Sequence, residues 1–119
     1  ALGGGAGANA RYLVGRWVAD AQLRHLGAVA FPWGTFAINV AGSAALGVLA
    51  AACAGRPDRR AWYVLLGTGV CGGFTTFSTF SVETVELLRE GRTAAALAYA
   101  LGSVAAGVAA AALALRLAR

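Results

Sequence analysis

The fold is decided by the stretch Gly67-Thr68-Gly69-Val70-Cys71-Gly72-Gly73-Phe74-Thr75-Thr76-Phe77-Ser78-Thr79-Phe80-Ser81. It lies in an apolar segment of residues 62–88, with glycines in its first half and alternating hydroxyls and phenylalanines in its second. The pair Gly72 and Gly73 weakens a helix by about 1 kcal/mol per residue relative to alanine. An interrupted membrane helix is tolerated only where it lines a polar cavity or is buried in protein. The stretch therefore predicts a helix broken near Gly72–Thr75 at a transport site.

The same stretch has a second interpretation as a packing face. Glycines let neighbouring helices approach closely in a membrane. Hydroxyl side chains in such a helix bond back to carbonyls of their own helix. On this interpretation the segment would be continuous and would line no pathway.

Composition indicates a membrane protein. The 119 residues are 59% hydrophobic and 13% charged, whereas soluble domains carry about 25% charged residues. The mean hydropathy is +0.67. A membrane-spanning helix needs roughly 20 residues, so four spans would use most of the chain. We expect an all-α membrane protein with one transmembrane domain (1–119), lipid around it and spans at about 2–23, 32–53, 62–88 and 93–117.

The arginines suggest how such a chain inserts. They supply all the positive side chains behind the net charge of +5, and they form no continuous basic stripe, so a nucleic-acid partner is not expected. Four spans would place five arginines on one side and three on the other, which is a weak orientation signal. The chain is therefore expected to insert in both orientations. Four short helices fill their own centre with side chains, so an aqueous path requires a homo-oligomer.

The first expected span carries charge within it. Arg11 has apolar neighbours on both sides, and an intramembrane arginine indicates a functional residue. The alternative is a structural charge that bonds helix-end carbonyls. Arg16 and Asp20 are spaced i,i+4, which places them to pair. No signal peptide is expected, because Ala1 is not followed by a charged region and a cleavage-type stretch.

A polar stripe runs along the second expected span. Thr35, Asn39 and Ser43 recur at i, i+4 and i+8, so they share one helix face. A buried amide in a membrane must find partners or line water. The stripe predicts that Thr35 and Asn39 face a transport pathway. The alternative for Asn39 is an interhelical hydrogen bond worth about 1 kcal/mol.

Beyond the predicted break, aromatic and polar side chains share one strip of helix. Phe77 and Phe80 are three residues apart, and Thr76, Thr79 and Glu83 run beside them. No second acid, base or nucleophile accompanies Glu83, and no GxSxG, HExxH, P-loop or CxxC pattern occurs. We therefore expect no enzymatic activity.

Two further features complete the pattern. Cys53 and Cys71 lack metal-ligand spacing and are expected to be free thiols. The last span is mostly alanine and leucine with small-residue spacing, and it is expected to serve as scaffold.

At this point the motifs resemble a known family. The element Gly34-Thr35-Phe36-Ala37-Ile38-Asn39 and the later run Gly72-Gly73-Phe74-Thr75-Thr76-Phe77-Ser78-Thr79-Phe80 are similar to the CrcB/Fluc fluoride channels. The early Gly4-Gly5-Ala6-Gly7 with Arg11-Tyr12 also resembles the start of that family. The resemblance implies a passive, fluoride-selective channel in the bacterial inner membrane that relieves fluoride toxicity. It also implies a dual-topology antiparallel homodimer with two pathways.

The resemblance extends to individual positions. Phe77 and Phe80 match pore phenylalanines whose ring edges face the anion, and Asn39 matches an asparagine near them. Arg11 matches the family's first-span arginine. Gly72 and Thr75 match the break whose backbone carbonyls, two from each subunit, hold a central structural sodium ion. At or beside the positions of the polar track lie Ser78, Thr79, Ser81 and Glu83.

The implied chemistry suits fluoride. Dehydrating this small anion demands dense donors, which hydroxyls and an amide supply, and aromatic ring edges carry partial positive charge. A carboxylate at Glu83 repels an anion, so it is expected either to be protonated or to accept bonds from track hydroxyls.

Two other classes of protein remain open on the residues alone. A small multidrug-type exporter also has four spans and dual topology, but it needs an acid embedded in its first span. The candidate acid, Asp20, lies near the end of that span. A non-transporting assembly subunit would leave the phenylalanine and hydroxyl strip without a role.

Overall fold

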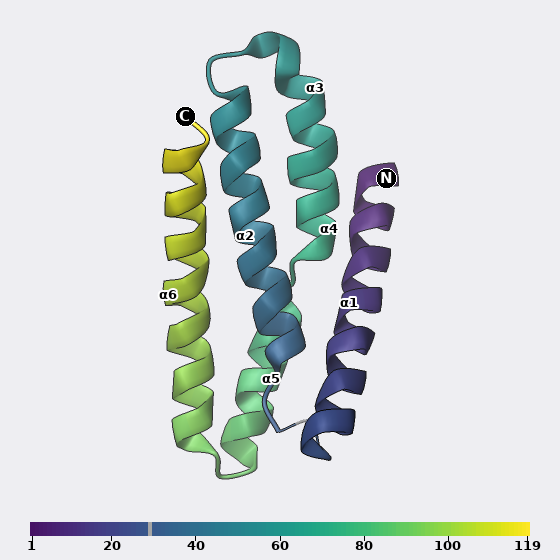
Figure 1. The fold of residues 1–119 in the computed structure, drawn as a ribbon, viewed down its shortest axis with the longest axis vertical. Coiled ribbons are helices and arrows are strands. Elements are labelled where there is room, and N and C mark those ends of the chain that lie inside the picture. Colours follow the sequence, from purple (N-terminus) through teal and green to yellow (C-terminus); the bar gives the residue numbers. More distant parts are fainter. Residues whose placement is uncertain (29) are drawn as a thin grey trace.

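The computed structural model describes residues 1–28 and 30–119. These residues form an elongated bundle of four long helical segments, 50 × 26 × 24 Å in extent, with no strand in either described range (Figure 1). The elements are α1 (Leu2–Leu26), α2 (Trp33–Cys53), η1 (Pro57–Arg59), α3 (Arg60–Trp62), η2 (Tyr63–Cys71), α4 (Gly72–Phe74), α5 (Phe77–Arg89) and α6 (Thr93–Leu117).

The third segment changes neighbours along its length. Its first part, α3 through α4, runs beside α2, and α1 packs against η2 and α4. After the break, α5 packs against α6, which also lies along α2 (Figure 1). The interruption therefore carries the chain from the α1 side of the bundle to the α6 side.

Glycine ends two of the helices. Gly27 follows α1 with φ of 72°, and Gly91 follows α5 with φ of 75°. The left-handed region favours glycine because no Cβ clashes there. After α5, the Gly91 and Arg92 amides donate to the carbonyls of Leu88 and Leu87 at 3.0 and 2.9 Å, which is the Schellman pattern of helix termination.

The third helix is interrupted, as the sequence predicts, and the extended residues lie at the end of the predicted range. Thr75 and Thr76 are extended, with φ, ψ of −77°, 159° and −151°, 115°. Gly72 and Gly73 remain helical, and Gly72 has φ of −63°. The expectation that the glycine pair breaks the helix is therefore wrong. The backbone leaves the helix where threonine hydroxyls compete with it for hydrogen bonds.

The glycines instead permit backbone contact between helices. A Cβ on Gly73 would collide with the Gly4 carbonyl oxygen, and one on Gly7 would lie 2.8 Å from the Phe74 nitrogen. The packing interpretation is thus correct for these glycines, although the segment is also broken. Close helix approach through glycines is a feature of membrane bundles.

We expect Gly7→Ala to destabilise the fold by about 1–3 kcal/mol, because the added methyl meets backbone atoms that cannot move independently. Gly5→Ala is the matched control, since a Cβ at Gly5 has no neighbouring atom within 4 Å. Thermal unfolding in detergent should show a lower midpoint for Gly7→Ala alone. Equal midpoints for the two variants would contradict the close approach of α1.

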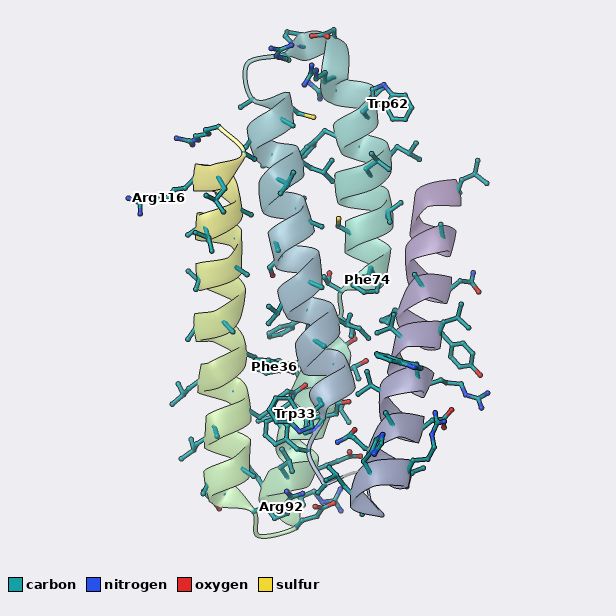
Figure 2. All side chains as sticks on the ribbon, viewed as in Figure 1. Trp33, Phe36, Trp62, Phe74, Arg92 and Arg116 are labelled. Atoms are coloured by element: carbon teal, nitrogen blue, oxygen red, sulfur yellow. The ribbon has the colours of Figure 1, made fainter. Side chains whose placement is uncertain are left out.

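Two helices, α2 and α6, are long and apolar enough to cross a membrane. The 25 residues of α1 match that length, but they include Arg11, Arg16, Asp20 and Arg24. The third segment has sufficient length only when its two parts are added together. Arg92 lies at one end of the bundle, and Arg116 and Trp62 lie toward the other (Figure 2). This arrangement agrees with a membrane protein of four long helices.

Candidate functional site

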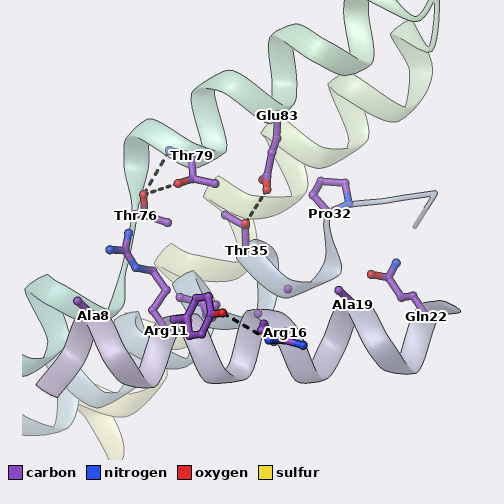
Figure 3. Close-up of a pocket in the computed structure, with 14 residues that line it drawn as sticks. Ala8, Arg11, Arg16, Ala19, Gln22, Pro32, Thr35, Thr76, Thr79 and Glu83 are labelled. Atoms are coloured by element: carbon purple, nitrogen blue, oxygen red, sulfur yellow. Dashed lines mark hydrogen bonds between the residues drawn. The ribbon is translucent and has the colours of Figure 1, made fainter. Parts of the chain in front are cut away.

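The break is organised around Thr76, whose side chain is almost fully buried. Its Oγ1 accepts a hydrogen bond from the Thr79 amide at 3.2 Å and donates to Thr79 Oγ1 at 3.0 Å (Figure 3). Ser78 Oγ lies 3.4 Å from the same oxygen. Thr76 is therefore the N-cap of α5, and it satisfies an amide that the helix itself leaves without a partner.

Asn39 on α2 holds the other side of Thr76. Its Oδ1 accepts from the Thr76 amide at 2.9 Å, and its Nδ2 donates to the Thr76 carbonyl at 3.1 Å. The side-chain amide thus pairs with one extended residue in both directions. The interhelical bond considered from the sequence is present. One hydrogen on Nδ2 is left over from this pairing, because a primary amide carries two donors.

The break diverts two amides from their usual helical carbonyl partners. In a continuous helix the Thr76 amide would bond to the Gly72 carbonyl, but here it bonds to Asn39. The Thr79 amide would likewise bond to the Thr75 carbonyl, but it bonds to Thr76 Oγ1. The amides that a continuous helix would direct to the Gly72 and Thr75 carbonyls are therefore both engaged elsewhere. Oxygen atoms of this kind are ligands for hard cations.

A second polar cluster lies farther along α5. Glu83 accepts a hydrogen bond on Oε1 from Thr35 Oγ1 at 2.9 Å and one on Oε2 from the Tyr99 hydroxyl at 2.6 Å. Thr35 is buried, and Tyr99 is fully buried. Both carboxyl oxygens therefore face hydroxyl donors, which is one of the two arrangements expected from the sequence.

The sequence analysis does not identify Tyr99, because its helix is expected to serve as scaffold. Tyr99 lies among alanines and leucines, so no polar periodicity marks its helix face. The sequence feature that could have identified it is a tyrosine within an otherwise apolar span. A buried tyrosine hydroxyl usually finds a hydrogen-bond partner. A search for such a partner would have identified an acceptor on another helix.

Two members of the α2 stripe bond to the broken segment. Thr35 reaches α5, Asn39 reaches the break, and Gly42 lies against the Thr75 side chain. Ser43 instead donates back to the Asn39 carbonyl at 2.8 Å. The i, i+4 spacing thus puts Thr35 and Asn39 on the face of α2 toward the broken segment.

The two phenylalanines differ in their surroundings. Their ring centroids are 5.8 Å apart. Phe77 is 79% exposed. Phe80 lies against Tyr99, with ring centroids 5.1 Å apart, beside the cluster formed by Leu87 and Ala96. Phe77 is therefore available to another molecule, whereas Phe80 also contributes to the packing of its own chain.

The three remaining hydroxyl positions lie on the first turns of α5. Ser78 and Thr79 are exposed in the chain. Ser81 donates to the Phe77 carbonyl at 2.9 Å, as hydroxyls within helices commonly do. The structure thus brings Ser78 and Thr79 to the break and leaves Ser81 bonded within its own helix.

Two cavities meet at the break. One, of about 570 Å³, is lined by Arg11, Thr35, Thr79 and Glu83 among others (Figure 3). The second, of about 430 Å³, is lined by residues that include Asn39, Gly72, Thr75 and Phe77. Thr76 lines both. The extended residues therefore separate two openings, each carrying several of the predicted site residues.

Charged residues of α1 border the first cavity. Arg11 reaches from α1 toward the cavity beside Thr76 (Figure 3). The described residues contain no hydrogen bond from Arg11 to a helix-end carbonyl, which was the structural alternative. Arg16 donates to the Tyr12 hydroxyl at 3.5 Å. It forms no ion pair with Asp20 within the described ranges, because its side chain turns back by one helical turn.

Comparison with known proteins places this architecture in a family. The model of the CrcB-like protein family, described as camphor resistance (CrcB), matches residues 1–115. The fluoride-specific ion channel FluC 2 of Rhodococcus jostii is 48% identical over 117 residues, covering 98% of this chain and 93% of that protein. The fluoride-specific ion channel FluC of Novosphingobium aromaticivorans is 50% identical over 108 residues, covering 91% and 83% of the two chains. The chain belongs to the CrcB family.

Proposed function

We propose that this chain is the subunit of a fluoride-selective channel that exports fluoride passively across the bacterial plasma membrane and so relieves its toxicity. The observation that carries the proposal is the broken third helix, in which one extended threonine is capped, paired with Asn39 and flanked by two cavities. The relatives, which are named fluoride-specific ion channels, support the same ion.

The anion pathway would follow the donors around the break. The free hydrogen of Asn39 and the exposed hydroxyls of Ser78 and Thr79 supply neutral donors. The ring edges of Phe77 and Phe80 add partial positive charge. Such groups replace water around fluoride with neutral side-chain donors, and weak sites of this kind allow the ion to leave.

In the proposed pathway Glu83 acts by orienting the hydroxyl groups of its two hydrogen-bond partners. Its two oxygens already accept from Thr35 and Tyr99. A carboxylate held in this way orients two hydroxyls. Charge-assisted bonds of this type are shorter and stronger than those between neutral groups.

We further propose a structural sodium ion at the centre of an antiparallel homodimer. The carbonyls of Gly72 and Thr75 suit such an ion, because the amides that would bond to them in a continuous helix bond elsewhere. Two carbonyls from each subunit would give four ligands at a two-fold axis. The bound cation would supply a fixed positive charge near the pathway.

The function is tested with purified protein in liposomes loaded with fluoride or chloride salts. A fluoride electrode should record rapid efflux that protein-free liposomes lack, and chloride-loaded vesicles should release far less anion. Absence of fluoride efflux from well-folded protein, or equal release of both anions, would overturn the proposal.

We expect subunits of opposite orientation in the functional dimer, because three arginines face one side and five the other under four spans. Single cysteines introduced at Ala54, the C-cap of α2, and at Glu90, the C-cap of α5, provide the measurement, because these two helices end at opposite ends of the bundle (Figure 1). In a Cys53→Ala, Cys71→Ala background, labelling from one side of intact vesicles should modify half of each site. Complete labelling of one site and none of the other would show a single orientation.

We expect replacement of sodium by a large organic cation on both sides to abolish fluoride efflux, since four carbonyls pointing at an empty centre repel one another. Thr75→Ala should keep the sodium dependence, because its hydroxyl donates to the Cys71 carbonyl and the proposed ligand is the backbone oxygen. Full efflux without sodium would remove the ion from the proposal and leave the channel intact.

A further inference from the structure

A buried amide lies away from the break, near the carboxyl end of α1. Gln22 is 7% exposed, and it is one of only three buried polar side chains in the described ranges. Its Nε2 donates to the Phe31 carbonyl at 2.8 Å. A buried amide is retained where it has a partner, because burial without one is costly. Gln22 therefore ties α1 to the chain that leads into α2.

The Phe31 carbonyl is the centre of a tight turn. It also accepts from the Trp33 amide at 2.8 Å, and Pro32 between them has φ, ψ of −78° and 60°. These values describe an inverse γ-turn. Two donors thus converge on one carbonyl, and α2 begins immediately after it. The hydrogen bond from Gln22 consequently helps to fix the residue at which α2 begins.

The chain on each side of this turn is linked to Glu83 through a hydroxyl donor. On one side the Phe31 ring meets Tyr99 edge-on, with centroids 5.4 Å apart and an interplanar angle of 79°. On the other, Thr35 lies in the first turn of α2. Tyr99 and Thr35 are the two hydroxyl donors to Glu83. One turn therefore sets the position of both donors.

We infer that Gln22 is a positioning residue for ion conduction, which holds the turn at Pro32 and thereby keeps Thr35 and Tyr99 on Glu83. Gln22 borders the same cavity as Thr35 and Glu83, and its hydrogen bond goes to the backbone of Phe31. This inference rests on the proposed channel function. It assigns to Gln22 no contact with the anion.

The test compares Gln22→Met with Asn9→Leu. Methionine keeps the unbranched shape of glutamine and removes its donor. Asn9 is an exposed amide on the same helix that bonds only to the Gly5 carbonyl of its own helix. Fluoride efflux per assembled dimer should fall at least tenfold in Gln22→Met and remain at the wild-type rate in Asn9→Leu. Should Gln22→Met not assemble, Gln22→Asn keeps the amide one methylene short of Phe31, and the same loss is expected.

A double-mutant cycle separates positioning from a general structural role. In a Tyr99→Phe background one donor to Glu83 is already missing, so Gln22→Met should reduce efflux by far less than in the wild-type background. An equal fold-change in both backgrounds, wild-type efflux in Gln22→Met, or failure of both Gln22 variants to assemble would overturn the inference. Lack of fluoride efflux by the wild-type protein would instead overturn the proposed function.

Discussion

Asn39→Asp is expected to reduce fluoride efflux by at least about tenfold while the dimer still assembles. The aspartate can accept from the Thr76 amide, but when ionised it cannot donate to the Thr76 carbonyl as Asn39 does. A buried acceptor left without its donor costs about 1–3 kcal/mol in stability, whereas a tenfold fall in efflux corresponds to about 1.4 kcal/mol on the conduction barrier. A negative charge at the break would add repulsion of the anion.

The measurement needs a control variant with the same Asn-to-Asp exchange at a position outside the proposed pathway. Asn9→Asp makes the identical exchange on the exposed face of α1 and should leave efflux unchanged. Efflux and the elution volume of the dimer are to be recorded on the same preparations. Unchanged efflux in an assembled Asn39→Asp dimer would remove Asn39 from the pathway and leave it as an interhelical bond.

The second large effect is expected at the phenylalanine pair. Isoleucine has enough bulk for a packing position, where exchanges of similar volume usually cost less than about 1.5 kcal/mol. It lacks the positive ring edge that a pathway position would use. We expect Phe77→Ile and Phe80→Ile to lose most fluoride efflux at one or both positions. The loss of stability should be much smaller.

The structure shows which variant gives the clearer answer. Phe77 is largely exposed, so its replacement removes little packing within the chain, whereas Phe80 contacts the buried Tyr99. Phe77→Ile should therefore keep its unfolding midpoint, and Phe80→Ile should show a lower one. Full efflux from both stable variants would show that Phe77 and Phe80 serve only in packing.

The sequence predicted the elements that have a local signal. Four long helical segments, an interruption of the third and the α2 face carrying Asn39 all follow from composition and helical periodicity. Such patterns depend on residues close together in the chain. The family resemblance, carried by the two motifs, was confirmed by the comparisons.

What the sequence left unpredicted depends on contacts between distant segments. Gly73 packs against Gly4 of α1, some seventy residues earlier, and intrinsic propensity does not report such packing. The Tyr99–Glu83 and Gln22–Phe31 bonds each join separate elements. A polar residue alone in an apolar span carries no periodicity that would identify its partner.

The glycine contact of α1 has a consequence for biogenesis. Gly7 meets Val70 and Phe74, and Gly4 meets Gly73, so the ribosome must add roughly 66 residues after Gly7 before this contact can form. At about 5–20 residues per second, that interval is about 3–13 s. During this interval α1, which carries Arg11, Arg16, Asp20 and Arg24, can pack only on α2. A nascent chain cut short before residue 74 therefore lacks part of the backbone surface on which Gly7 packs.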